Sequence, residues 1–444
     1  MAEATTKEKD NDKTSGANAS PIFRTDRGAK TERDSRMKNE TVMILGAAEE
    51  HCLGIRAARE LGLRVFVTDG NAHSVGFAEA DASAVASTYA AEATLRVARE
   101  YIAGGGRIDG VLTLAADVPY TVAYVAHGLG LPNIGLEAAS NAGEKMRMKK
   151  CFQRRGVPIP LFREVRGPQD LVAVASEFGF PVVVKPVDSR GARGVQLVKD
   201  SARLAEAYDA ARKHSPTARV MVEQYLPGPQ LSTEGFMLHG EAHIPAVFDR
   251  NYEFLERFSP FIVEDGGEMP SIYVKEYESE IVEVMKQAAL ALGIETGVIK
   301  GDLVIHDGKV KVIEIAARLS GGFFGTVATP VSCGVDLLKT NILVSLGREI
   351  DPASLAHRFE KAAAIRFAFP PTGRVKKICG LEQVLADPAC RYAHVFAKAG
   401  DLIAPITNHP GRPAVVVAEG ASSGQAVANA KRLINCLTWE IEDA

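Results

Sequence analysis

The sequence of 444 residues lacks the features of several common protein classes. Its six cysteines form no CxxC pair and no spacing typical of a zinc site, so we expect reduced thiols in a cytoplasmic protein. No apolar run approaches the roughly 20 residues of a membrane span, and no apolar segment follows a basic start, as it would in a signal peptide. With a net charge of −3, the composition gives no indication of nucleic acid or a membrane as a partner.

Two common nucleotide-binding motifs are also absent. No GxxxxGK[ST] loop is present, which argues against a P-loop fold. A dinucleotide fold would have GxGxxG after the first strand, whereas this chain has "GAAEEHCLG", in which Glu49 and Glu50 would repel a pyrophosphate. We therefore expect neither a nicotinamide nor a flavin site, although strand ends in such a sheet remain a place for a substrate.

The residues that are present divide the chain into four segments. Residues 1–40 are polar and of mixed charge, which predicts a disordered tail. Residues 41–135 alternate apolar strands with helices, which is typical of an open parallel sheet. Residues 136–358 form a central domain, within which residues 158–227 are a smaller lid subdomain, and residues 359–444 form a small α+β domain. The predicted fold class is α/β, with α+β parts.

One charged residue, Lys185, interrupts an apolar strand in "FPVVVKPVDSRGARGV". Burying an unpaired ammonium is costly, so Lys185 should have an anionic partner. The loop that follows offers backbone N–H groups that a ligand can approach closely, together with Arg190 and Arg193. Two interpretations stay open from this stretch alone: a loop that closes over a triphosphate, or an ordinary hairpin with a solvated lysine.

A second pattern pairs two acids across a predicted hairpin. In "GDLVIHDGKVKVIEIAAR" the turn falls on Asp307-Gly308, and counting back from it puts Asp302 and Glu314 at similar distances along the two arms, where they could lie side by side on one face. Adjacent carboxylates repel each other unless a cation such as Mg²⁺ lies between them. Arg318 faces the same way and suits an anion. A solvated charged hairpin is the alternative, but the apolar neighbours of Glu314 fit it poorly.

These features follow one another in an order typical of one fold. Lys145 begins a basic helix, Lys185 and its loop follow, and Glu223 ends a strand in "VEQYLPG", where a carboxylate can accept the amine of adenine. The paired acids come last. From about Val42 to the C-terminus, the chain resembles an ATP-grasp carboxylate–amine ligase, closest in pattern to the amino-acid (dipeptide) ligases and the biotin carboxylases.

The resemblance implies a role for each residue of these motifs. Lys145 and Lys185 would contact the phosphates of ATP, while Asp302 and Glu314 would hold Mg²⁺ or Mn²⁺, expected as two ions. Arg318 and Lys185 would be the catalytic residues that neutralise the transferring phosphoryl group. The other nucleotide contacts would come from the phosphate loop, the strand end at adenine and the ribose position: Asp188, Ser189, Arg190, Gly191, Gly194, Glu223, Gln224, Tyr225, Leu226 and Gln230.

Three positions depart from the family pattern. The metal hairpin of the family often ends in Glu-x-Asn-x-Arg, whereas Ala316 here replaces the asparagine and removes a third metal ligand. Lys300 stands near a position where amino-acid ligases often have histidine, so the substrate pocket of those ligases does not predict the pocket of this chain. Gln230 stands where the family usually has a ribose-binding glutamate.

Four further residues are expected near the substrates: Asp117, Glu264, Ser320 and Gly321. Asp117 ends a predicted strand over Asp109–Asp117. Glu264 lies in residues 250–271, where aromatic and acidic residues alternate, and it either holds an α-ammonium or is a loop acid on the surface. The smaller C-terminal segment is expected to complete the substrate cavity.

The function that the resemblance implies is ADP-forming ligation. The γ-phosphoryl group of ATP would pass to a carboxylate, an amine would attack the acyl phosphate, and phosphate would leave. The expected partners are a small-molecule carboxylate, such as an amino acid, and an amine, and the family suggests a homodimer. Two alternatives stay open: a carboxyphosphate or carbamoyl-phosphate enzyme of nucleotide metabolism, and a non-catalytic ATP-binding protein.

Overall fold

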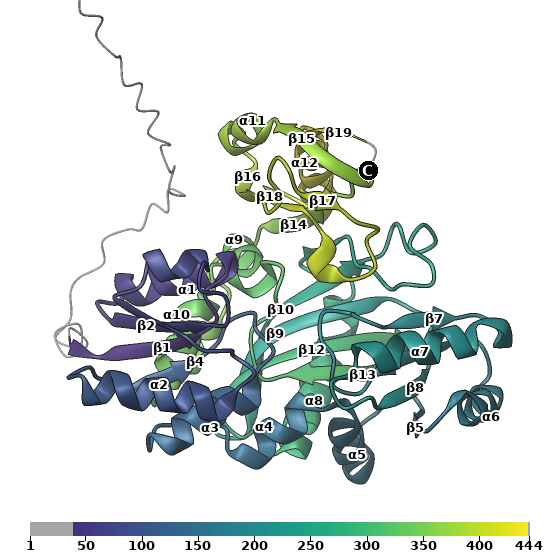
Figure 1. The fold of residues 1–444 in the computed structure, drawn as a ribbon, viewed down its shortest axis with the longest axis horizontal. Helices are drawn as coiled ribbons and strands as arrows, with labels where there is room; N and C mark the ends of the chain where they lie inside the picture. Colours follow the sequence, from purple (N-terminus) through teal and green to yellow (C-terminus); the bar gives the residue numbers. More distant parts are fainter. Residues whose placement is uncertain (1–38, 443–444) are drawn as a thin grey trace, which may run out of the picture. The chain divides into compact units, whose positions relative to one another are not determined.

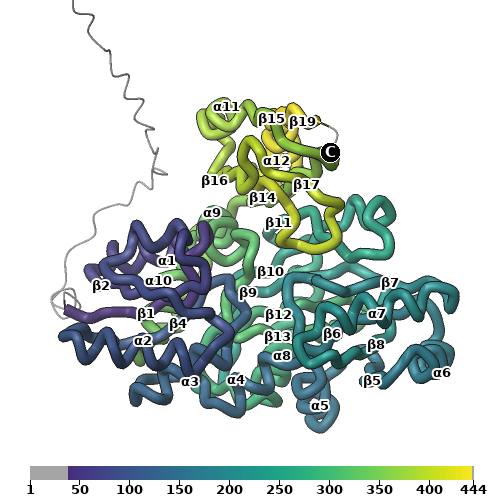
Figure 2. The backbone as a smooth tube through the Cα atoms, viewed as in Figure 1, coloured from purple at the N-terminus to yellow at the C-terminus, as the bar shows by residue number. Residues whose placement is uncertain are grey.

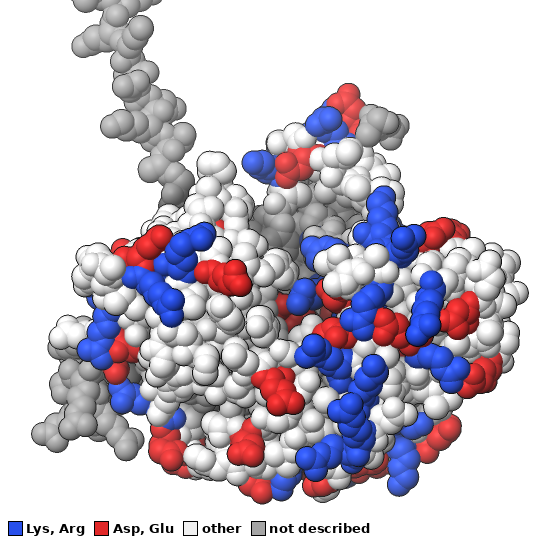
Figure 3. Space-filling model, turned by 60° about the horizontal axis from the view of Figure 1, so that its bottom comes forward, with Lys and Arg blue, Asp and Glu red and all other residues white. Residues whose placement is uncertain are grey.

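The computed structural model describes residues 39–442, and the predicted disordered tail lies outside these residues except for its last two. Within the described residues the strands form four sheets, and Figure 1 labels most of their strands. No helix in this part of the chain is long and apolar enough to cross a membrane. On the face drawn in Figure 3, basic and acidic side chains are interspersed, in keeping with the nearly balanced charge of the sequence.

The first sheet is parallel throughout, as predicted, with the order β3-β2-β1-β4. Its strands are β1 (Thr41–Leu45), β2 (Arg64–Asp69), β3 (Ala82–Val85) and β4 (Gly110–Leu112). The helices of this segment are α1 (Glu49–Glu60), α2 (Ala91–Ala103), α3 (Pro119–Gly128) and α4 (Leu136–Gly143), with the short helix η3 (Val75–Ala78). The predicted strand Asp109–Asp117 is wrong in length, because the chain leaves the ladder after Leu112 and Pro119 soon opens α3.

The largest sheet of the described chain is antiparallel and has the order β13-β12-β9-β10-β11-β14-β18-β16. Its strands are β9 (Gln230–Leu238), β10 (Glu241–Asn251), β11 (Gly266–Met269), β12 (Gly297–His306), β13 (Lys309–Ala316), β14 (Ala362–Phe367), β16 (Cys390–Val395) and β18 (Ala414–Gly420). Figure 2 traces the chain through it, from teal and green to yellow-green. Because β14 pairs with β11, residues beyond 358 continue the sheet of the central segment, and the predicted domain boundaries stay predictions.

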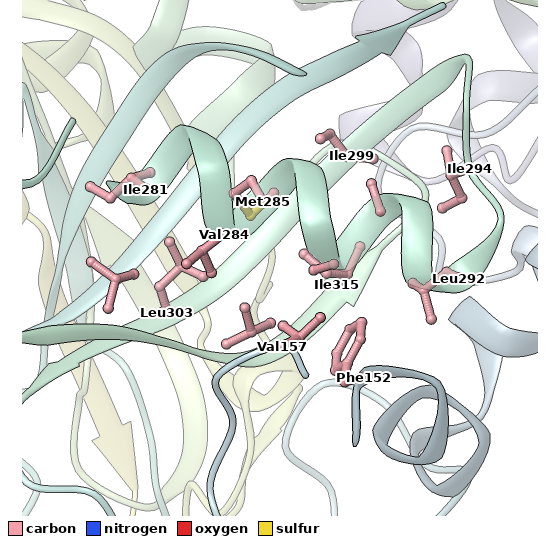
Figure 4. Packing of buried hydrophobic residues seen from close by; sticks show 14 of the residues in the cluster. Phe152, Val157, Ile281, Val284, Met285, Leu292, Ile294, Ile299, Leu303 and Ile315 are labelled. Carbon is pink, nitrogen blue, oxygen red and sulfur yellow. The ribbon is translucent and has the colours of Figure 1, made fainter. Parts of the chain in front are cut away.

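One face of this sheet is closed by helix α8 (Val274–Leu292). Met285 of the helix packs against Ile299, Leu303 and Ile315 of the sheet in a buried apolar cluster, part of which Figure 4 shows. Side chains alternate between the two faces of a strand. Lys300, Asp302 and Glu314 are therefore left on the opposite face, where a cavity lies.

A β-bulge sets which side chains of the β12–β13 hairpin face this cavity. The turn at Asp307-Gly308 has positive φ angles of 51° and 68°, as a two-residue hairpin turn requires. A plain count from the turn would place Ile313 opposite Asp302, but the register shifts by one residue there, and Asp302 pairs with Glu314. The predicted side-by-side placement of the two acids is therefore confirmed, and the extra residue makes it possible.

The lid segment contains an antiparallel sheet with the order β5-β8-β6-β7. Its strands are β5 (Phe162–Val165), β6 (Val182–Pro186), β7 (Gln196–Val198) and β8 (Val220–Gln224). Helices α6 (Pro168–Phe178) and α7 (Leu204–His214) share one apolar cluster with this sheet. On its other face Met146 packs with Met221, and Lys185 and Glu223 line the cavity. Helix α5 (Lys145–Arg155) precedes β5 and is followed by Gly156 in a left-handed conformation.

The remaining elements complete the C-terminal half of the chain. They are η4 (Ser201–Arg203), η5 (Phe324–Ala328), α9 (Thr329–Cys333), α10 (Leu337–Ser345), η6 (Pro352–Leu355), β15 (Gly373–Cys379), α11 (Leu381–Ala386), β17 (Leu402–Ile403), η7 (His409–Gly411), α12 (Ser423–Asn435) and β19 (Thr438–Glu442). Strands β17, β15 and β19 form a small separate sheet.

Candidate active site

One cavity of about 640 Å³ brings together most of the predicted site residues. Its walls come from the β1–α1 connection, the face of the lid sheet opposite α6 and α7, the face of the large sheet opposite α8, and the C-terminal segment. The predicted residues that line it are Asp117, Lys145, Lys185, Ser189, Arg190, Gly191, Glu223, Gln224, Tyr225, Leu226, Gln230, Glu264, Asp302, Glu314, Arg318, Ser320 and Gly321. Phe367, Phe396, His409 and Arg412 of the C-terminal segment also line it.

Two residues of the predicted phosphate loop do not line the cavity. The carboxylate of Asp188 accepts hydrogen bonds from Ser215 Oγ at 2.5 Å and Thr217 Oγ1 at 2.6 Å, so it faces the end of α7. Gly194 has a φ of +74°, and a Cβ there would lie 2.9 Å from Cβ of His214. Both residues therefore shape the loop. The backbone oxygen of Ser189 accepts from Lys145 Nζ at 2.8 Å, which fastens the loop to α5.

Lys185 is buried, so the interpretation of it as a solvated lysine is wrong. Its ammonium contacts Oε2 of Glu223, and Nζ of Lys149 lies 3.0 Å from Oε1 of the same carboxylate. Burial alone would raise the pKa of Glu223, but the two lysines more than offset it and hold the pKa below its usual value. Lys149 was not predicted, although it lies one helical turn after Lys145, where a second lysine can reach the same side.

A second cluster surrounds Asp302 on the floor of the cavity. Oδ1 of Asp302 accepts from Arg250 at 2.8 Å and also contacts the ammonium of Lys300. Burial raises the pKa of Asp302, yet Arg250 and Lys300 outweigh it and hold the pKa well below its usual range. The carboxylate is therefore ionised at neutral pH.

Glu264 is buried, so the interpretation of it as a surface acid is wrong. Arg250 Nε donates to its Oε2 at 2.5 Å, and a guanidinium nitrogen of Arg412 lies 3.4 Å from its Oε1. Burial lowers the pKa of the adjacent His409 to about 3, so its ring is neutral. Arg412 lies 148 residues along the chain from Glu264, and nothing in the local sequence pattern could have indicated this contact.

Arg318 projects from the end of β13 toward the N-terminal sheet. Its Nε lies 3.7 Å from Asp117, and Asp117 is also 3.7 Å from Nε of Arg190 in the phosphate loop. The hydroxyl of Ser320 is buried and has no hydrogen-bond partner among the described residues. An unsatisfied buried hydroxyl that lines the cavity, two residues after Arg318, suits an anionic or carbonyl group of a ligand.

Two glutamates that sequence reasoning did not place in the site hold the segment after Arg318. Glu50 accepts from the backbone N–H groups of Gly322 and Phe323, each at 2.9 Å. Glu234 accepts from the N–H of Ser320, and burial raises the pKa of Glu234 to about 7. From the sequence we expected Glu50 only to repel a pyrophosphate, whereas its carboxylate binds backbone N–H groups of the same chain.

The carboxylate pair fits a divalent cation that takes its other ligands from a nucleotide. Asp302 and Glu314 lie directly opposite each other on adjacent strands. The residues that the structure describes contain no cluster of three or more His, Cys, Asp or Glu side chains that could hold a metal. Mg²⁺ is commonly bound by one or two carboxylates together with substrate phosphates and water, so two carboxylates are sufficient protein ligands.

Comparison with known proteins identifies the class. Residues 178–327 match the model of the ATP-grasp domain, and residues 366–442 match the model described as L-amino acid ligase C-terminal domain 2. The chain thus contains an ATP-grasp domain, and the predicted ATP-grasp fold is confirmed. The predicted resemblance to ATP-grasp ligases of the amino-acid ligase branch is confirmed as well.

Individual relatives agree with this assignment. An uncharacterized protein y4rH of Sinorhizobium fredii is 25% identical over 75% of this chain and 68% of its own length. A D-alanine–D-alanine ligase of Pseudomonas fluorescens is 27% identical over 59% of this chain and 78% of its own length. The crystal structure of an L-amino acid ligase from Bacillus licheniformis has a TM-score of 0.78 and 24% identity, covering 91% of this chain and all of that one.

Proposed function

We propose that this protein is an ADP-forming ligase that joins the carboxylate of an amino acid to an amine or a second amino acid. The observation that carries the proposal is the placement of the carboxylate pair Asp302 and Glu314 in one cavity with Lys145, Lys185 and Arg318. Phosphoryl transfer depends on positioning and charge neutralisation, and it needs no protein nucleophile. The ligases among the relatives support the choice of an amino acid as the carboxylate.

Each group has a distinct task in this proposal. Lys145 and Lys185 bind the phosphates of ATP, and the strand end from Gln224 to Leu226 binds adenine through its backbone. Asp302 and Glu314 would hold Mg²⁺, which neutralises phosphate charge when it is bound. Arg318 orients the substrate carboxylate and the phosphoryl group that it receives.

The proposed reaction has two steps. A carboxylate oxygen of the first substrate attacks the γ-phosphorus of ATP and gives an acyl phosphate and ADP. The unprotonated amine of the second substrate then attacks the acyl carbon, and the tetrahedral adduct loses phosphate and a proton to leave the amide. The neutral ring of His409 and the buried Glu264–Arg412 pair close the cavity on the side of the C-terminal segment.

The test is a measurement of ADP and phosphate release by the purified full chain with Mg-ATP, across a matrix of amino acids and small amines. Turnover that requires particular pairs, with the amide detected by mass, would support the proposal. AMP as the nucleotide product would contradict it. Turnover with bicarbonate but without an amino acid would favour the carboxyphosphate alternative, and tight ATP binding without turnover would favour a binding protein.

A variant pair sharpens the test. Lys185→Ala should abolish turnover and still fold, because Lys149 remains to neutralise Glu223. Lys199→Ala removes an exposed lysine that pairs with Glu256 at the surface, and it should leave turnover unchanged. Equal turnover in the two variants would refute the phosphate-site assignment.

A further inference from the structure

The position that departs from the metal-binding pattern, Ala316, faces a lysine. In the register of the β12–β13 hairpin, Ala316 lies directly opposite Lys300. On the other side of β12, Lys300 lies opposite Glu234 of β9. Directly opposed residues have Cβ atoms about 5 Å apart, so the methyl group of Ala316 leaves room for the long side chain beside it.

The ammonium of Lys300 is built into the acidic site. The side chain is only 11% exposed and its Nζ contacts Oδ1 of Asp302. Arg250 donates to the same oxygen at 2.8 Å. Both fixed cations therefore approach Asp302 through Oδ1, and Oδ2 is left for a further cation.

Glu314 completes the set of acceptors. Its Oε1 lies 3.5 Å from Nζ of Lys145, and the residue lines the cavity directly across from Asp302. The two carboxylates supply two negative charges beside the positive charges of Lys300, Arg250 and Lys145, and the phosphates of the nucleotide add the negative charge that a divalent cation needs. A second divalent cation would meet the ammonium of Lys300 and find no ligand on Ala316.

We propose that this site binds its nucleotide with one divalent cation, held by Asp302 and Glu314, and that the ammonium of Lys300 takes the place of a second ion. The inference rests on the proposed function, because it assumes that a nucleotide occupies the cavity. It replaces the two ions expected from the sequence. The ammonium of Lys300 then supplies a positive charge without the binding of a second metal ion. The small side chain of Ala316 leaves the space that the lysine occupies.

The experiment counts Mn²⁺ ions by electron paramagnetic resonance. The full chain is mixed with an equimolar amount of a non-hydrolysable ATP analogue, at concentrations well above the dissociation constant, and titrated with Mn²⁺. The wild-type chain should bind one Mn²⁺ per bound nucleotide. The double variant Lys300→Met/Ala316→Asn, which removes the ammonium and restores an oxygen ligand, should bind two.

Two controls separate the charge from other effects. Lys300→Arg keeps the positive charge and should still bind one ion. Lys309→Met removes an exposed lysine from the same hairpin and should also bind one. Two ions in the wild-type chain would overturn the inference and leave the ligase proposal standing, and so would one ion in a folded double variant. Failure of the wild-type chain to bind the analogue would instead overturn the proposed function, and this inference with it.

Discussion

Two buried clusters face the cavity, and each holds one carboxylate between two cations. In the first cluster, on the lid side, Glu223 meets Lys149 and Lys185. In the second, on the large sheet, Asp302 meets Arg250 and Lys300. The charges are the same, but Glu223 uses one oxygen for each lysine, whereas both cations of Asp302 share Oδ1. Each oxygen of Glu223 therefore faces a lysine, whereas in our proposal Oδ2 of Asp302 receives the divalent cation.

Exposure follows the same division. The side chains of Glu223 and Lys149 are 3% and 2% exposed, while those of Asp302 and Arg250 are 17% and 12% exposed. A buried ion pair is costly to break because the remaining charge has no water to solvate it. The comparison teaches that loss of the carboxylate should cost the fold more in the lid cluster, which also presents Lys185 to the cavity, than in the more exposed cluster on the large sheet.

The largest expected effect is on the lid cluster. Glu223→Gln should destabilise the protein by about 3–5 kcal/mol, because it leaves two buried lysines without a negative partner. Urea unfolding followed by circular dichroism measures this change. If the free energy of unfolding falls no more than it does for a surface substitution, the lid cluster is solvated and does not differ from the cluster on the large sheet.

The next effect concerns pH. Burial raises the pKa of Glu234 from 4.5 to about 7, so the folded chain retains a proton that the unfolded chain has already released in this window. Stability should therefore fall by roughly 3 kcal/mol as the pH rises from about 4.5 to 7. Glu234→Gln carries no titrating proton and should remove that part of the slope. Urea unfolding at several pH values tests it, and identical slopes in both proteins would contradict the assignment.

A smaller effect of opposite sign belongs to Asp302. Because its pKa is lowered on folding, its contribution is complete above the pKa of about 4 of an unfolded aspartate and is lost as the pH falls. Asp302→Asn should cost about 2 kcal/mol at neutral pH, since Arg250 keeps Glu264 as a partner. Its main result should be loss of Mn²⁺ binding, measured by titration. Unchanged Mn²⁺ affinity would show that Asp302 holds no metal.

The smallest effect should come from the surface. Glu256→Gln breaks the exposed pair with Lys199 and should change the free energy of unfolding by less than about 1 kcal/mol. The same urea experiment measures it, so it serves as the matched control for Glu223→Gln. A loss as large as that of Glu223→Gln would mean that burial does not explain the difference between the clusters.

Much of the fold could be predicted because its signals are local. The Asp307-Gly308 turn fixed the hairpin, and the apolar run around β1 indicated a buried parallel strand. The burial of Lys185 was signalled by the valines before it. The short strand β4 was mispredicted because an apolar sequence continues past the point where pairing ends.

The rest of the site depends on contacts that no local pattern carries. Arg412 reaches Glu264 from the far end of the chain, and Glu50 caps the backbone at Gly322 across 272 positions. The absence of asparagine at Ala316 was visible in the sequence. That Lys300 lies beside it depends on the register after the bulge, which counting from the turn does not give.

The bulge at Ile313 also has a consequence for how this hairpin can vary in evolution. Val312 pairs with Leu303 and Glu314 with Asp302, so Ile313 is the residue that the ladder leaves without a partner. Loss of one residue from β13 between the turn and Glu314 would close the bulge and leave Glu314 opposite Asp302, whereas loss of one residue from the same stretch of β12 would require a second unpaired residue on β13. Single-residue deletions should therefore be tolerated on one arm of the hairpin and should separate the two acids on the other.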